Sequence, residues 1–268
     1  MKLKVLVENH TYIDQYFSGE PAVSFYLEDG DKRILFDVGY SDLIIKNASV
    51  MNIDLNRIDT IIFSHGHNDH TRGLVYLTEQ YDLSGVEVIA HSDVFKRRVC
   101  KGQDIGSPIL EENLKNLCQL HLVKEPLKVS PNLTFLGEIP TLCEFEPRRA
   151  VGKLEEGSAW KEDLILDDTA LVYKNEQGLY IITGCSHSGI CNIIEYAKRI
   201  CKDDRIVAVI GGFHLFEVND RVKAVVHYFK ENQIQSLYPC HCVSFQVKAY
   251  IHQEIPICEV GVGLELEW

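Results

Sequence analysis

Apolar and polar residues alternate in short runs near the start of the chain and predict β-strands. Such runs cover residues 4–8, 23–28 and 33–36, and side chains two apart share one face of a strand. The turn sequence EDGD at 28–31 separates the second and third runs, which predicts a β-hairpin. A short apolar run at 58–63 then predicts a buried strand.

Helices and further strands are predicted along the rest of the chain. The helices are expected at residues 42–50, with Ser41 as the cap, and at 71–80, 93–100, 190–200, 218–232 and 243–252. The strands are expected at residues 86–90, 170–174, 179–183, 205–210, 234–238 and 264–268. Alternation of strands and helices in each half, after an opening hairpin, predicts an α/β or mixed α+β fold.

The domain organisation follows from what interrupts this pattern. Residues 101–165 contain many glycines and prolines, with short β-like runs at 121–123 and 133–136, and predict an elaborated insertion. No linker rich in serine, glycine or charge separates the two halves. We therefore expect a single domain over residues 1–268.

Composition narrows the class of protein. The 268 residues are 46% hydrophobic and 25% charged, with a net charge of −12, as in an ordinary globular protein. The acidic balance disfavours a nucleic-acid partner. No apolar stretch approaches the 20 or so residues that cross a membrane. Nine cysteines without a CxxC pair, and a start that does not read as an export signal, predict a reduced, cytoplasmic protein with most thiols in the core.

Four metal-ligating residues follow the buried strand at 58–63. They are His65, His67, Asp69 and His70. His65 and His67 point the same way in extended chain and could grip one ion, while Asp69 and His70 face a second position. Imidazole and carboxylate are good ligands for zinc, and also for iron or manganese. The alternative is a polar loop at the start of a helix, with Ser64 as its cap and the histidines solvated.

These residues resemble the hallmark of the metallo-β-lactamase superfamily. That hallmark is H-x-H-x-D-H after a buried strand, and residues 65–70 match it at every position. A second hallmark, an upstream hairpin that ends in Asp-x-Gly, is matched at residues 37–39. The resemblance implies a four-layer αββα sandwich with the metals at one edge between the two sheets. It also implies that Asp37 supports the metal-binding loop.

Three later segments are similar to one branch of that superfamily, the dihydropterin-(ribofuranosyl)aminobenzene 5′-phosphate synthase-like metal-dependent hydrolases. They are TGCSHSGI at 183–190, IGGFHL at 210–215 and YPCHC at 238–242. Two positions depart from the branch pattern. Val243-Ser244 stands where Thr-Gly is usual, and Thr71-Arg72-Gly73 stands where a Gly-Gly pair is common. Both positions flank the edge of the sheet where the active site is expected. The resemblance therefore predicts metal binding more firmly than it predicts the substrate.

The resemblance leaves the remaining ligands open. His241 is our choice for the late histidine ligand. Either His187 is the third ligand of the first metal ion, or residues 167–169 take the third-histidine position and Cys185 replaces the bridging aspartate. We favour His187, because imidazole is the commonest metal ligand. His187 could instead hydrogen-bond the start of the following helix.

His214 has three readings: a metal ligand, a donor to a substrate oxyanion, or a satisfied histidine at a strand end. Arg148, Arg149 and Lys153 place three cations in one short stretch. They could bind a phosphate, and the alternative is a solvated charged loop.

The expected function is hydrolysis of a phosphoester or related ester by two divalent ions, zinc first, with manganese or iron as alternatives. The partner is a small, phosphorylated substrate, and nothing in the sequence sets the oligomeric state. Asp69 would orient the attacking hydroxide or accept its proton, and His214 would help the leaving group. The alternatives are condensation of a phosphoribosyl donor with an aminobenzoate, di-iron redox chemistry, and a non-catalytic metal-binding sensor.

Overall fold

The computed structural model describes residues 1–268, which divide into two compact units. Unit 1 comprises Met1–Lys124, Ala150–Asp167 and Gly261–Trp268, and unit 2 comprises Glu125–Arg149 and Asp168–Val260. The expected insertion at 101–165 thus contributes chain to both units. That all 268 residues act as one domain stays a prediction.

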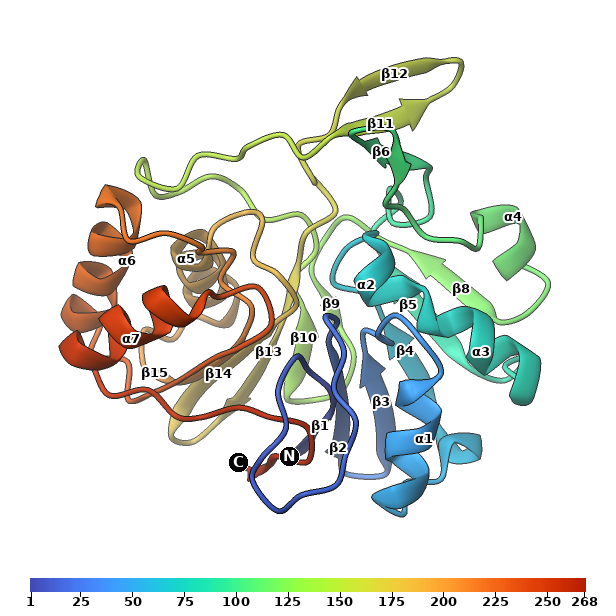
Figure 1. Cartoon of the computed structure of the whole chain (residues 1–268), viewed down its shortest axis with the longest axis horizontal. Helices are drawn as coiled ribbons and strands as arrows, with labels where there is room; N and C mark the ends of the chain where they lie inside the picture. The colour runs from blue at the N-terminus through green and yellow to red at the C-terminus, as the bar shows by residue number, and fades with distance from the viewer. The chain divides into compact units, whose positions relative to one another are not determined.

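Unit 1 is built on a mixed seven-stranded sheet, coloured mostly blue and cyan in Figure 1. Its strand order is β17-β1-β2-β3-β4-β5-β8. The strands are β1 (Lys2–Val7), β2 (Ser24–Asp29), β3 (Lys32–Phe36), β4 (Thr60–Ile62), β5 (Glu87–Ala90), β8 (Gln119–Leu122) and β17 (Glu265–Glu267). The predicted hairpin is confirmed, because β2 and β3 pair antiparallel around Gly30.

Short helices pack on this sheet. They are α1 (Leu43–Val50), the 3-10 turn η1 (Leu55–Arg57), α2 (Asn68–Thr71), α3 (Gly73–Gln80) and α4 (Glu111–Leu114). Apolar side chains of α1 and α3, among them Ile44 and Leu77, join Leu35 and Val88 of the strands in one buried cluster. The prediction of Ser41 as the cap of this helix is wrong by one residue, because Asp42 is the N-cap residue of α1; the Ser41 hydroxyl still accepts from Leu43 N–H at 3.2 Å.

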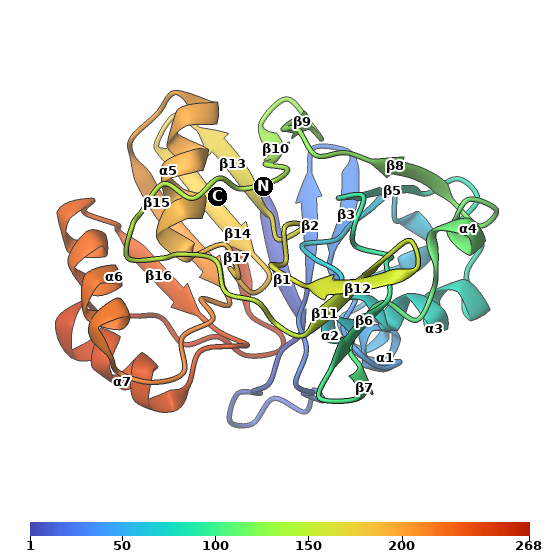
Figure 2. The same ribbon diagram turned by 90° about the horizontal axis from the view of Figure 1, so that it is seen from above.

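A four-stranded antiparallel sheet completes unit 1, in the order β12-β11-β6-β7 (Figure 2). Its strands are β6 (Arg98–Cys100), β7 (Gln103–Asp104), β11 (Lys153–Glu156) and β12 (Ala159–Glu162). The helix expected at 93–100 is therefore wrong. Residues 92–95 form a turn, and the chain becomes strand at Arg98, which pairs with Leu154 of β11 and carries a fully buried side chain.

Unit 2 is a six-stranded sheet with three helices (Figure 1). The strand order is β16-β15-β14-β13-β10-β9. Its elements are β9 (Leu127–Lys128), β10 (Leu133–Phe135), β13 (Ala170–Asn175), β14 (Gly178–Thr183), α5 (Ile190–Cys201), β15 (Ile206–Gly211), α6 (Asp220–Glu231), β16 (Ser236–Pro239) and α7 (Phe245–Glu254). Helix α5 packs against β13 and β14, and the apolar faces of all three helices share one buried core with the sheet.

No helix in the chain combines the length and the apolar character that crossing a membrane requires.

Candidate metal centre

The register of two parallel strands places the first group of candidate ligands in unit 1. Strands β3 and β4 run parallel, with Phe36 opposite Ile62. Both strands therefore end at the same edge of the sheet. Residues that follow parallel strands place their functional groups at that edge. Asp37 follows β3 at once, and residues 63–70 follow β4.

Three imidazoles of this loop lie against one another. His65 Nε2 and His67 Nδ1 are 3.0 Å apart, and the rings of His65 and His70 have centroids 4.1 Å apart. Asp69 Oδ2 lies 3.7 Å from His70 Nε2. All three histidines are buried, so the reading of solvated loop histidines does not hold. Burial lowers the pKa of His67 to about 4, which keeps this imidazole neutral, the form that binds a metal.

Asp37 holds this loop from the neighbouring strand. Its carboxylate accepts from Ser64 N–H at 2.8 Å and from the Ser64 hydroxyl at 2.7 Å. The same carboxylate lies 2.7 Å from His70 Nδ1. Because a carboxylate on one ring nitrogen fixes the tautomer, the lone pair of His70 lies on Nε2, where a metal ion can bind. The hydroxyl of Ser64 donates its hydrogen bond to Asp37 and does not cap α2. The N-cap residue of α2 is His67.

A buried ion-pair network supports the loop from its other side. Arg98 is fully buried and binds Asp163 at 2.7 Å and Asp167 at 2.6 Å. Asp167 also accepts from Gly66 N–H at 2.8 Å. A Cβ at Gly66 would stand 1.7 Å from Arg98 Nη1, so only glycine fits between His65 and His67.

The second group of candidate ligands lies at one edge of the unit 2 sheet. Strands β14, β15 and β16 run parallel, and Thr183, Gly211 and Pro239 stand in register at their ends. The loops that follow carry Cys185 and His187, then His214, then His241 and Cys242. The rings of His187 and His214 have centroids 4.1 Å apart.

Asp168 reaches the same edge from β13, since Ala170 pairs with Thr183. Its Oδ2 accepts from Ser188 N–H at 2.9 Å and from the Ser188 hydroxyl at 2.5 Å. Its Oδ1 is buried and has no hydrogen-bond partner. Burial raises the pKa of Asp168 against those two hydrogen bonds. An unsatisfied buried carboxylate oxygen is costly, and a cation would satisfy it.

Backbone strain gathers in these loops. Asp37, Ser186, His214 and His241 all have φ between 50° and 58°, in the left-handed region. Such conformations are uncommon for residues other than glycine and cluster at functional sites. The Cys242 thiol is unusual as well. Burial would raise its pKa, but hydrogen bonding with Cys185 and His214 holds it well below the ordinary value.

The buried imidazoles, carboxylates and thiols of these loops suit a divalent metal ion. A family model for the metallo-beta-lactamase superfamily matches residues 18–199. The chain belongs to the metallo-β-lactamase superfamily. The predicted membership is thus confirmed, and the fold is the metallo-β-lactamase fold.

Individual relatives of this superfamily cover almost the whole chain. Uncharacterized protein MJ0448 of Methanocaldococcus jannaschii is 33% identical over 94% of both chains. The 7,8-dihydropterin-6-methyl-4-(beta-D-ribofuranosyl)-aminobenzene-5'-phosphate synthase of the same organism is 29% identical over 95% of this chain and 91% of its own. The crystal structure of Tm1679, a metal-dependent hydrolase of the beta-lactamase superfamily, superposes with a TM-score of 0.85 at 29% identity, over 100% of this chain and 99% of that one.

The predicted site residues divide between the units of this metallo-β-lactamase chain. His65, His67, Asp69 and His70 come together in unit 1, and His187 and His214 come together in unit 2. His241 follows β16 in unit 2 and is buried. Asp168 and Cys185, the alternative to His187, lie at the same edge of the unit 2 sheet.

The three cations considered for phosphate binding do not all belong to one unit. Arg148 and Arg149 lie in unit 2 and Lys153 lies in unit 1. The Arg148 guanidinium donates to the carbonyl of Ile139 at 2.8 Å. Arg149 and Lys153 are exposed, which fits a solvated charged loop. A phosphate role for these residues stays a prediction.

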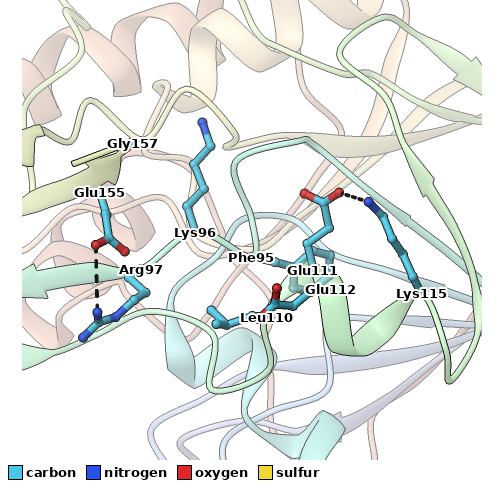
Figure 3. Close-up of a pocket in the computed structure, with 9 residues that line it drawn as sticks. All are labelled: Phe95, Lys96, Arg97, Leu110, Glu111, Glu112, Lys115, Glu155 and Gly157. Atoms are coloured by element: carbon cyan, nitrogen blue, oxygen red, sulfur yellow. Dashed lines mark ion pairs between the residues drawn. The ribbon is translucent and has the colours of Figure 1, made fainter. Parts of the chain in front are cut away.

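A separate hollow of about 410 Å³ in unit 1 is also rich in charge (Figure 3). Its cations are paired with acids. Arg97 lies 3.9 Å from Glu155, Lys115 lies 2.7 Å from Glu111, and Lys96 lies 2.6 Å from Asp93. The paired charges leave no free cation for an anionic ligand here.

The sequence analysis missed three groups of this site. They are the buried pair of Arg98 and Asp163, the contact of Ser188 with Asp168, and the thiol of Cys242. One signal was present in the sequence: the residue between His65 and His67 is glycine, which marks a close approach by another group.

Proposed function

We propose that the chain is a metal-dependent hydrolase that cleaves a phosphoester or a related ester of a small, phosphorylated molecule. The observation that carries the proposal is the cluster of three buried imidazoles and Asp69 at the end of β4. Membership in a superfamily that contains metal-dependent hydrolases supports it. The phosphoester preference rests on the suitability of two divalent ions for phosphoryl oxygens.

The ligands of the proposal are His65, His67 and His187 for one ion, and Asp69, His70 and His241 for the other. Zinc is the expected metal, with manganese or iron as alternatives. Two such ions would supply Lewis-acid stabilisation of a phosphoryl oxygen and would activate water as the attacking group. Residence in the cytoplasm belongs to the proposal and rests on the reduced cysteines.

The side chains of this site divide the remaining work. Asp69 is 30% exposed at its side chain, so it can reach water, orient the attacking molecule and accept its proton. Asp37 fixes the ring of His70. His214 either donates to the leaving-group oxygen or serves as a ligand. No nucleophilic side chain is required.

The test combines metal content with a substrate panel. The purified chain is loaded with Zn²⁺, Mn²⁺ or Fe²⁺ and assayed against phosphomonoesters, phosphodiesters and lactones. His67→Ala and Asp69→Asn should each lower turnover by about 10²–10⁴-fold. His227→Ala is the control, because His227 is exposed and pairs only with Glu231 on its own helix. Unchanged turnover in metal-free protein would reject a metal-dependent hydrolase, and stoichiometric metal without any turnover would favour the sensor.

A second candidate is a synthase-type condensation. The observation that favours it is the relative of 29% identity that is named a 7,8-dihydropterin-6-methyl-4-(beta-D-ribofuranosyl)-aminobenzene-5'-phosphate synthase. Incubation with an aminobenzoate and a phosphoribosyl donor, followed by mass spectrometry, tests it directly. A ribosylated aminobenzene product, with no hydrolysis of any ester in the panel, would replace the hydrolase proposal.

A further inference from the structure

Two cysteines and a histidine of unit 2 form a cluster whose members are not among the six ligands assigned to the proposed hydrolase, although Cys185 and His214 are alternatives there. Cys185, His214 and Cys242 each offer one donor atom, and the three atoms lie within 4.8 Å of one another. We propose that these three residues bind a soft divalent cation, Zn²⁺ being the expected ion, through two sulfurs and one imidazole nitrogen. The proposal does not depend on hydrolysis, and it assigns His214 to metal binding.

Backbone pairing brings the three residues together from loops far apart in sequence. Leu215 forms an isolated parallel bridge with Val243, so the residues before them, His214 and Cys242, lie side by side. His214 N–H donates to Cys242 Sγ at 3.3 Å, and the Cys242 thiol donates to the carbonyl of Cys185 at 3.4 Å. The sulfur of Cys242 is therefore held between the other two residues.

Gly212 makes room for this sulfur. A Cβ at Gly212 would stand 2.4 Å from Cys242 Sγ and 2.6 Å from the carbonyl oxygen of Gly184. Real Cβ atoms do not approach other atoms so closely, because the van der Waals radii overlap. Glycine at this position lets the Cys242 thiol pack against the loop that carries Cys185.

His214 supplies an unsatisfied donor to the same place. Its Nδ1 is buried and has no hydrogen-bond partner, although a buried polar atom without a partner is costly. Its backbone is held at φ 50°, a conformation that costs a histidine free energy. A cation bound at Nδ1 would satisfy the nitrogen and account for the strained backbone.

The spacing suits zinc after a small adjustment. Zinc binds sulfur at about 2.3 Å and imidazole nitrogen at about 2.0 Å in a tetrahedron, so its ligand atoms stand roughly 3.5–3.8 Å apart. The upper limit of 4.8 Å observed here exceeds that spacing by about 1 Å, which side-chain rotation can close. Two thiolates with one imidazole select zinc over hard ions such as Mg²⁺. Three protein ligands leave one position for an outside molecule, as in zinc sites that bind substrate.

Cobalt reports the donor atoms directly, because a thiolate bound to Co²⁺ gives a charge-transfer band in the near-ultraviolet. The full-length chain is stripped of metal with a chelator, kept anaerobic and titrated with Co²⁺. The wild-type protein should show the band. Cys185→Ser and Cys242→Ser should each lower its intensity by about half, and the double variant should abolish it. His214→Ala should weaken Co²⁺ binding at this position.

Two further variants keep the test decisive. Cys258→Ser is the matched control, since Cys258 is exposed and lies outside the cluster, and its band should equal that of the wild type. Gly212→Ala keeps every donor atom but displaces the Cys242 sulfur, so its band should fall as in Cys242→Ser. Circular dichroism of each variant verifies folding.

The results separate this inference from the proposed hydrolase. Cobalt bound stoichiometrically without a charge-transfer band would overturn it, as would a band that Cys242→Ser leaves unchanged. A full band in a protein that turns over no ester would reject hydrolysis and leave the thiolate site standing. Ester turnover in a protein without the band would support hydrolysis and overturn the thiolate site.

Discussion

Gly66 and Asp167 are joined by a hydrogen bond of 2.8 Å across 101 residues of sequence. The backbone N–H of Gly66, between two predicted ligands, donates to a carboxylate that Arg98 also binds. The metal motif is therefore tied to the buried Arg98 as well as to its own strand. Four predictions follow from the contacts around this loop and from one buried thiol.

Arg98→Leu should lower the free energy of unfolding by about 3–5 kcal/mol, because it leaves Asp163 and Asp167 as buried charges without a partner. Arg97→Leu is the neighbouring control. Its guanidinium is half-exposed, 3.9 Å from Glu155, and the expected loss is only about 0–1 kcal/mol. Urea unfolding followed by circular dichroism measures both, and similar losses in the two variants would contradict the network.

Gly66→Ala should destabilise the chain by about 3 kcal/mol, because the new methyl group would overlap Arg98 and would stand 2.2 Å from the carbonyl oxygen of Val94. Gly85→Ala is the matched control, since nothing lies within 4 Å of its added Cβ. Its stability should change by no more than about 0.5 kcal/mol. A melting temperature of Gly66→Ala equal to that of the wild type would contradict this prediction, because the loop would then admit the methyl group without loss of stability.

Asp37→Asn should weaken zinc binding by about 10–100-fold, because an amide supports the ring of His70 less well than a carboxylate does. Isothermal titration calorimetry of the metal-free protein measures the affinity. Asp31→Asn alters an exposed turn residue of the same hairpin and should leave the affinity unchanged. An unaltered dissociation constant in Asp37→Asn would mean that His70 binds no metal.

Cys118 should make stability fall at alkaline pH. Burial raises the pKa of its thiol from 9.0 to about 11, and the thiol donates to the carbonyl of Leu114 at 3.3 Å. The unfolded chain loses this proton first, so the stabilisation is complete below pH 9 and is lost as the pH rises through 11. The loss amounts to about 1.4 kcal/mol per pH unit within that window.

Urea unfolding at pH 8, 9, 10 and 11 measures this dependence. Cys118→Ala should show a shallower decline than the wild type, and Cys258→Ala, which removes an exposed thiol, should follow the wild type. Parallel curves for Cys118→Ala and the wild type would contradict a raised pKa.

The strands and the metal motif could be predicted because the information for both is local. An apolar run such as residues 58–63, followed at once by histidines, predicts that a buried strand ends where the metal ligands begin. Strands β13 and β14 and helices α5 and α6 lie where the sequence placed them, within one or two residues. The helix expected at 71–80 is observed as α2 and α3, which are separated only by Arg72, a residue with helical backbone angles.

The supports of the site could not be predicted because their partners are distant in sequence. Residues 93–100 contain enough apolar side chains for a helix, yet Arg98 pairs with two aspartates more than 60 residues away. That pairing and the strand contacts of β6 override the local preference. Likewise, Cys242 lies beside His214 because of the bridge between Leu215 and Val243, which no spacing in the sequence reveals.

Strand β17 pairs with β1 at the edge of the unit 1 sheet, where Leu3 lies opposite Leu266. The polypeptide thus completes both segments of unit 2 before it returns to the first sheet and adds this strand. On the ribosome, unit 2 is synthesised while β1 still has an open edge, since β17 emerges afterwards. Nascent chains at that stage carry an unpaired strand edge that can associate with another chain, and the pairing of β17 with β1 then covers this edge.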